Sequence, residues 1–233
     1  MMALIHGRSE RGTTRTGWLT SRHTFSFGGF HDPERMGFRA LRVLNDDEVV
    51  PGAGFGMHPH DEMDIVTYVI SGALRHQDSL GNTSIIRGGE IQHMYAGTGV
   101  VHSEMNASET EPVHFLQIWI VPERRGGEPT YFQVEVDLTS RPNEFVTVAG
   151  PDDVHGRARL RSDTGVFMAR LDEGASVHRR FPEGRAGFLH VVDGAVEVKG
   201  NRLSAGDGLQ FEAIGECGIT AKDGADLILF DLD

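Results

Sequence analysis

Two pairs of residues with metal-binding side chains stand in the first half of the chain. His58 and His60 form one pair, His102 and Glu104 form the other, and each pair has one residue between its members. Alternate side chains of a β-strand share a face, so each pair can direct two ligand atoms to the same side. Glycines frame both pairs, in the segments GFGMHPHDEMDIVTYVISG and GGEIQHMYAGTGVVHSEMN. The sequence therefore predicts that these four side chains converge on one metal ion.

The ligand types limit the chemistry of this site. Three imidazoles and one carboxylate suit a borderline divalent ion, and Fe(II), Mn, Co, Ni, Cu and Zn all accept such ligands. If the ion is six-coordinate, two positions stay open for a substrate and dioxygen. A site without sulfur ligands is also more typical of an open catalytic centre than of a closed structural one. Glu104 has two candidate roles, as a purely structural ligand or as a base that accepts a proton from an enolic substrate hydroxyl.

Three further histidines near these pairs are weaker candidates. His76 and His114 have no partner at ligand spacing, so we interpret them as hydrogen-bonded or exposed side chains. His93 would lie on the strand face opposite Gln92 and Met94, which we expect to line the cavity. None of the three is predicted to bind the ion.

Composition excludes several classes of function. The chain has 233 residues, a net charge of -12 and a single cysteine, Cys217. A strongly negative protein is a poor ligand for the phosphates of nucleic acids and of anionic membranes. One cysteine allows no internal disulfide, and no apolar run is long enough for a signal peptide or a bilayer span. We expect a monomeric cytoplasmic protein that binds neither nucleic acid nor membrane.

Short runs rich in branched and aromatic residues predict a β-structure. They cover residues 40–44, 65–70, 114–121, 166–171, 188–192 and 227–232. Turn sequences such as Ser71-Gly72 and Asp193-Gly194 stand between them. Many short strands joined by tight turns are typical of a barrel or a sandwich.

The chain also contains an internal repeat. Residues 68–92 and 190–210 share an order of apolar strand, glycine, alternating strand, Gly-Asn turn and strand. We therefore predict two similar β-domains in tandem, with a boundary near residues 149–153. The N-terminal domain, residues 1–145, would carry the metal site. The C-terminal domain, residues 146–233, would be a degenerate copy without metal, because its corresponding strand offers only His178.

These segments resemble a known family. A glycine followed by HxH and an acid, and later a Gly-x-x-His, is similar to the two motifs of the cupin superfamily. More narrowly, TFSFGGFHDP, HPHDEMDIVTYVISG, HQDSLGN, AGTGVVHSEMN and HFLQIWIVP resemble the pirin family. The resemblance implies an all-β bicupin, in which two tandem antiparallel jelly-roll barrels face each other. It also implies one metal in the N-terminal barrel, held by the four side chains named above, and it favours Fe(II).

The sequence departs from the pirin pattern at one position near the ligands. Asp64 stands where the family usually has glutamate after the HxH segment. A shorter carboxylate could change a contact behind the ligands or the shape of the pocket without removing a ligand.

The resemblance implies an activity as well. Pirin-like proteins are associated with quercetinase activity, so we expect a metal-dependent oxidoreductase of the quercetin 2,3-dioxygenase type. Its substrates would be dioxygen and a small aromatic flavonol, and it would release carbon monoxide. The alternative is a non-catalytic module whose metal senses the redox state and acts through a protein partner. A third reading is an ion that only stabilises the barrel.

Overall fold

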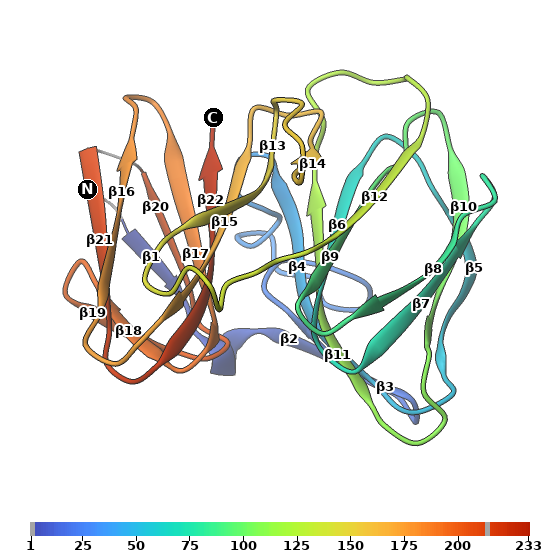
Figure 1. Ribbon diagram of the computed structural model, residues 1–233, viewed down its shortest axis with the longest axis horizontal. Coiled ribbons are helices and arrows are strands. Elements are labelled where there is room, and N and C mark those ends of the chain that lie inside the picture. Colours follow the sequence, from blue (N-terminus) through green and yellow to red (C-terminus); the bar gives the residue numbers. More distant parts are fainter. Residues whose placement is uncertain (1–2, 213–214) are drawn as a thin grey trace. The chain divides into compact units, whose positions relative to one another are not determined.

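The protein is built from β-strands, as the sequence predicts (Figure 1). The computed structural model describes residues 3–212 and 215–233. Within these ranges the helical structure is one 3₁₀ turn, η1 (Arg8–Glu10). None of the described residues form a helix that is long and apolar enough to cross a membrane. The strands divide between two compact units, which we call the N-terminal and C-terminal units.

The N-terminal unit comprises residues 12–136 and 160–162. Its strands are β2 (Gly12–Arg15), β3 (Leu19–His23), β4 (Leu41–Val49), β5 (Gly54–His60), β6 (Asp64–Ser71), β7 (Ala73–Asp78), β8 (Thr83–Arg87), β9 (Glu90–Tyr95), β10 (Val100–Asn106), β11 (Val113–Ile120) and β12 (Thr130–Glu135). They form a seven-stranded sheet in the order β12-β9-β6-β11-β4-β3-β2 and a four-stranded sheet in the order β5-β10-β7-β8.

Apolar side chains from both sheets form the core of this unit. Leu74 and Ile86 of the four-stranded sheet belong to one buried cluster with Val69, Val113 and Phe115 of the seven-stranded sheet. Apolar burial of this kind is the main force that holds two sheets face to face. The inward faces of β5 and β10, next to this cluster, carry the predicted metal ligands.

The C-terminal unit comprises residues 3–11, 137–159 and 163–233. Its strands are β1 (Ala3–His6), β13 (Val146–Gly150), β14 (Ala158–Arg159), β15 (Gly165–Leu171), β16 (Ser176–Phe181), β17 (Ala186–Asp193), β18 (Ala195–Val198), β19 (Asn201–Ser204), β20 (Gly208–Glu212), β21 (Gly215–Ala221) and β22 (Ala225–Leu232). The sheet orders are β1-β20-β17-β22-β15-β13-β14 and β16-β21-β18-β19. Strand for strand, these orders repeat those of the N-terminal unit, so the predicted internal repeat is present in the topology.

Residues 137–145, predicted to belong to the N-terminal domain, lie in the C-terminal unit. The chain also exchanges two short segments across the predicted boundary at residues 145 and 146. Residues 3–11 lie in the C-terminal unit, where β1 pairs with β20 in the position that β12 takes beside β9. Residues 160–162 lie in the N-terminal unit, because the backbone N–H of Arg161 donates to the Asp64 carboxylate over 2.8 Å. Both exchanges depend on long-range hydrogen bonds, which a boundary read from local composition does not contain.

Candidate metal centre

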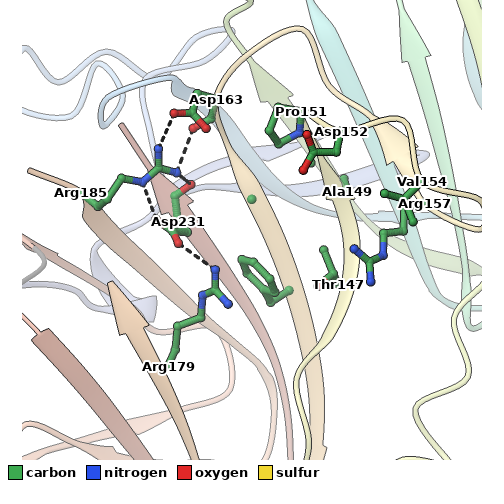
Figure 2. A pocket seen from close by; sticks show the side chains of 13 residues that line it. Thr147, Ala149, Pro151, Asp152, Val154, Arg157, Asp163, Arg179, Arg185 and Asp231 are labelled. Carbon is green, nitrogen blue, oxygen red and sulfur yellow. Dashed lines mark hydrogen bonds and ion pairs between the residues drawn. The ribbon is translucent and has the colours of Figure 1, made fainter. Parts of the chain in front are cut away.

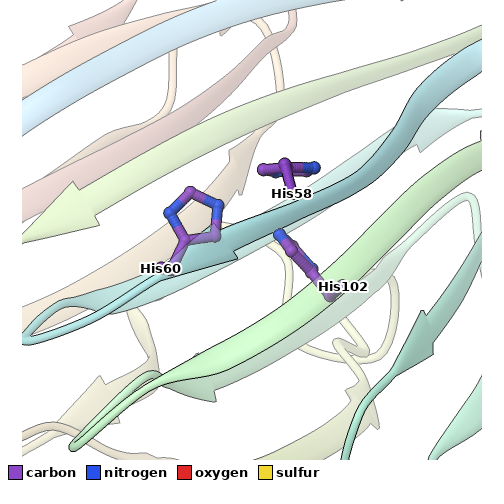
Figure 3. A group of neighbouring side chains, drawn as sticks. All are labelled: His58, His60 and His102. Carbon is purple, nitrogen blue, oxygen red and sulfur yellow. The ribbon is translucent and has the colours of Figure 1, made fainter.

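The structure brings three of the four predicted ligands together. His58 and His60 lie on β5, and His102 lies on β10 (Figure 3). One ring nitrogen of each histidine lies within 4.8 Å of a ring nitrogen of the other two. The ring centroids are 4.5 Å apart for His58 and His102, 4.8 Å for His58 and His60, and 4.9 Å for His60 and His102. This triangle follows from strand alternation and from the pairing of His58 with His102 across the ladder.

A bulge in β5 adds an aromatic side chain to this face. His102 pairs with His58 and Glu104 pairs with Phe55, so β5 has one residue more than β10 over this stretch. The extra residue of a β-bulge shifts the alternation of the strand, so a side chain that would otherwise point to one face of the sheet points to the other face. Phe55 and His58 therefore both line the same cavity, although three positions separate them in the sequence.

The hydrogen bonds of two imidazoles leave a nitrogen free for an ion. His58 donates from Nδ1 to the carbonyl of Gly56 over 2.7 Å, which leaves its Nε2 with a lone pair. His102 Nε2 is buried and has no hydrogen-bond partner among the residues that the structure describes. A buried polar atom without a partner costs about 1–3 kcal/mol, a cost that a bound ion would remove. The donor set therefore fits a divalent transition metal.

The charge state of the rings agrees with this assignment. Burial, together with the smaller effect of the neighbouring His58 ring, lowers the pKa of His102 to about 2 and the pKa of His60 to about 4. Imidazoles with such pKa values are neutral at physiological pH. The neutral ring is the form that binds a metal.

Glu104, the fourth predicted ligand, lies in the same cavity but outside the close group of imidazole nitrogens. Its side chain is buried, and its carboxylate accepts hydrogen bonds from Gln117 Nε2 over 2.7 Å and from Thr67 Oγ1 over 3.3 Å. Burial raises the pKa of Glu104, while the hydrogen bond from Gln117 acts in the opposite direction. Thr67 and Gln117 thus hold the carboxylate at the edge of the imidazole triangle.

His76 is a site residue that the sequence analysis did not assign. It is fully buried on β7, and its Nε2 donates to Asp78 over 3.0 Å. The Nδ1 lone pair then faces Nδ1 of His102 at 3.4 Å and Nε2 of Gln92 at 3.1 Å. With a proton on its Nδ1, His102 presents the Nε2 lone pair toward His58 and His60. Asp78 and His76 therefore fix the tautomer of a predicted metal ligand.

Asp78 is itself firmly placed. It accepts from the backbone N–H groups of Leu80 and Asn82 and from the Asn82 side chain. Although burial acts in the opposite direction, the hydrogen bonds from Asn82 and His76 hold the pKa of Asp78 below its usual range. The chain from Asp78 through His76 to His102 thus begins at an ionised carboxylate.

A cavity of about 240 Å³ opens beside the imidazole triangle. Its lining combines aromatic walls with polar groups, and consists of Phe27, Asn45, Asp47, Phe55, His58, His60, Glu104, Gln117 and Trp119. Trp119 packs edge-on against His60 with ring centroids 5.0 Å apart, and Phe27 packs edge-on against Trp119 at 5.3 Å. A flat aromatic ligand suits walls of this kind.

Asp47 is a second carboxyl in this cavity. Its side chain is 2% exposed, and its Oδ1 has no hydrogen-bond partner among the described residues. Burial raises the pKa of Asp47 to about 7, while a hydrogen bond from Ser21 acts in the opposite direction. A carboxyl of this kind can donate or accept a hydrogen bond near neutral pH.

Asp64, the departure from the pirin pattern, lies outside the imidazole group. Its side chain is buried, its Oδ1 accepts from His93 Nε2 over 2.7 Å, and its Oδ2 accepts from the Arg161 backbone. His93 faces away from the imidazoles, as predicted from strand alternation, but Gln92 and Met94, which were expected to line the cavity, are not among its lining residues. The shorter carboxylate thus anchors residues 160–162 to the N-terminal unit.

Comparison with known proteins identifies the family. Residues 6–120 match the Pirin family and residues 147–232 match the family described as quercetinase C-terminal cupin domain. A quercetin 2,3-dioxygenase of Escherichia coli strain K12 is 42% identical, and the match covers 99% of both chains. A pirin-like protein of Caulobacter vibrioides is 41% identical over 92% of this chain and 93% of that protein.

A solved structure agrees with these matches. The crystal structure of a bacterial pirin from Escherichia coli in complex with nickel(II) is 40% identical, has a TM-score of 0.94 and covers 99% of each chain. The predicted all-β bicupin fold is therefore confirmed. The chain belongs to the pirin family.

Proposed function

We propose that the protein is a metal-dependent quercetin 2,3-dioxygenase, an oxidoreductase that cleaves a flavonol ring with dioxygen and releases carbon monoxide. One observation carries the proposal, which is the convergence of three imidazoles beside an aromatic-lined cavity. The full-length relative called quercetin 2,3-dioxygenase supports the same reaction.

In this proposal His58, His60, His102 and Glu104 hold one ion, and that ion is Fe(II). The nickel(II) complex of a 40% identical pirin supports a divalent ion at such a site. When bound, the ion would act as a Lewis acid toward the flavonol oxygens and would mediate electron transfer to dioxygen. The imidazoles contribute neutral nitrogen ligands, and His76 keeps His102 in the tautomer that can bind.

The side chains around the ligands would bind and orient the substrate. Phe27, Phe55 and Trp119 present ring surfaces for a flat flavonol. Glu104 accepts the proton of the substrate's 3-hydroxyl, which makes the ring electron-rich enough to react with dioxygen. Gln117 donates to the Glu104 carboxylate over 2.7 Å and so keeps it directed into the cavity. The apolar walls also exclude water from the reacting ring.

The test compares the native protein with variants of two ligands. The purified protein is analysed for its metal, reloaded with Fe(II), and mixed with quercetin in air. Loss of quercetin absorbance and release of carbon monoxide are measured for the native protein, for His58→Ala and for Glu104→Gln. His178→Ala is the matched control, because its imidazole lies on β16 with 59% of its side chain exposed. Circular dichroism establishes that each variant is folded.

Turnover by the native protein and by His178→Ala, but not by the two cavity variants, would support the proposal. Absence of turnover with every first-row divalent metal would refute it. If the inactive protein then bound a partner only in one redox state, the non-catalytic sensing module would be the better assignment. If His58→Ala failed to fold, the ion would have the structural role.

A further inference from the structure

The C-terminal unit has a counterpart for each strand of the metal centre. Gly72 and Gly194 mark equivalent turns, since each has a positive φ and is followed by alanine at the start of β7 or β18. From these turns, β7 pairs Leu74 with Asn106, and β18 pairs Val196 with Ala221. The strand registers thus align the two units residue by residue.

This alignment shows what replaces the metal ligands. His58 faces His102 across the β5–β10 ladder, and Arg179 faces Cys217 across the β16–β21 ladder. The positions of His58, His60, His102 and Glu104 are taken by Arg179, Phe181, Cys217 and Ile219. A guanidinium group therefore occupies the place of one imidazole, and the other three positions are apolar and buried.

The interior of the C-terminal unit is filled where the N-terminal unit is hollow. Asn45 pairs with Gln117 in the N-terminal unit, and the equivalent pair is Phe167 with Leu229. Phe167 and Leu229 belong to the large apolar core cluster of their unit. Beside this filled interior the C-terminal unit has a cavity of about 350 Å³, which is lined in part by Phe167. This volume lies within the range of small-molecule sites.

Arg179 forms one side of this cavity (Figure 2). Its Cζ lies 3.6 Å from the centroid of the Phe167 ring, and its Nη2 donates to Asp231 over 2.9 Å. Its Nε is buried and has no hydrogen-bond partner in the part of the chain that the structure describes. Its Nη1 is not buried and makes no hydrogen bond with a described residue, so this guanidinium group, held on an aromatic ring, keeps a donor for an anion in the cavity.

Asp231 and Arg185 hold Arg179 in position. Arg185 donates from Nε to the Asp231 carboxylate over 2.7 Å and from Nη1 to the Asp163 carboxylate over 2.8 Å. Its Nη2 reaches the backbone carbonyls of both aspartates at 2.9 Å. Each of its three nitrogens is therefore engaged, so Arg185 acts as a brace and leaves ligand binding to Arg179.

Arg157 supplies a second cation on the other side of the cavity. Figure 2 shows Thr147 between the guanidinium groups of Arg157 and Arg179. Arg157 forms no ion pair with another described residue, whereas Arg159, two positions later, pairs with Asp153 and does not line the cavity. Two guanidinium groups that approach one space from opposite sides favour an oxyanion between them.

The charged side chains that line the cavity indicate how much negative charge a ligand can carry. Three arginines, Arg157, Arg179 and Arg185, are balanced by three aspartates, Asp152, Asp163 and Asp231. A dianionic phosphate would be repelled by these carboxylates, while a monoanion needs only the free donors. We propose that this cavity binds a small organic monocarboxylate between Arg157 and Arg179. In this barrel the guanidinium group of Arg179 stands at the position of a predicted metal ligand, His58, of the other barrel.

The test uses sodium benzoate as the probe and the full-length protein. Binding is followed by ¹⁵N–¹H NMR, which identifies the residues whose signals shift, and the affinity is measured for Arg157→Gln and Arg179→Gln. Arg159→Gln is the matched control. Loss of one charged hydrogen bond should weaken benzoate binding by about 10- to 100-fold in both cavity variants. The control should bind as the native protein does.

Two companion ligands define the chemistry. Benzamide has the same shape without the charge and should bind more weakly than benzoate, and inorganic phosphate should bind more weakly as well. The proposal is overturned if benzoate shifts no signals at the cavity, if benzamide matches it, or if phosphate binds more tightly. If Arg179→Gln does not fold, Arg157→Gln decides the question, because its guanidinium group holds no other described residue.

Discussion

Replacing Asp47 with asparagine should change how the stability of the N-terminal unit depends on pH. Burial raises the pKa of Asp47 from the model-compound value of 3.8 to about 7 in the folded chain. Between these values the native protein binds a proton that the unfolded chain has lost, so the free energy of unfolding falls as pH rises. At about 1.4 kcal/mol per unit, the fall from about pH 5 to about pH 8 is about 2.5 kcal/mol. Asparagine cannot titrate and removes this term.

The assay is urea unfolding of the metal-free protein, followed by tryptophan fluorescence. Both tryptophans, Trp18 and Trp119, belong to the N-terminal unit and report on its unfolding. The free energy of unfolding of the native protein minus that of Asp47→Asn should decrease as pH rises over this range. Glu48→Gln is the control, because this neighbouring side chain is 48% exposed and its ion pair with Arg22 contributes little. A difference for Asp47→Asn that stays constant or increases with pH would mean that Asp47 is ionised in the native protein.

Three further changes test other parts of the reasoning. His76→Phe removes the acceptor that fixes the tautomer of His102, and should weaken nickel(II) binding about 10- to 100-fold by calorimetry; unchanged affinity would contradict the tautomer assignment. Nickel(II) at about 100 times its Kd should raise the free energy of unfolding by about 2.7 kcal/mol in the native protein. The same gain in His102→Ala at the same nickel(II) concentration would place the ion elsewhere. Gly72→Ala would put a Cβ 2.5 Å from the Pro112 carbonyl oxygen and should destabilise the unit in urea by about 1–3 kcal/mol more than Gly81→Ala, whose Cβ meets no atom within 4 Å. Equal losses would mean that backbone strain, rather than this contact, sets the cost.

The sequence predicted the parts of the site that depend on neighbouring residues along one strand. His58 and His60 share a face of β5 because a strand repeats every two residues, and this holds before any tertiary structure is known. The same spacing was present in His76 and Asp78 on β7, where it joins an imidazole to a carboxylate instead of an ion. The spacing could not predict that β7 pairs with β10, and this pairing brings His76 next to His102.

The apolar pattern also underestimated the length of one strand, because polar side chains occupy its second half. The apolar run of residues 40–44 predicted a short strand, whereas β4 continues to Val49. Asn45 and Asp47 point inward from this strand and line the cavity, so the alternation continues with polar residues at the buried positions. Hydrophobic patterning locates a strand only where its inward face is apolar. It is therefore least informative at the strands that build a functional cavity.

Comparison of the two units shows why the hydrophobic pattern fails only near the candidate site. At the positions where the N-terminal unit buries Asn45, Asp47 and Gln117, the C-terminal unit has Phe167, Ala169 and Leu229. Buried polar groups require partners, and several in the N-terminal unit, including Asp47 Oδ1 and His102 Nε2, have none among the described residues. A fold that tolerates an apolar filling at the same positions does not need those polar groups for folding. Their retention beside the imidazole triangle is explained by a ligand that supplies the missing partners.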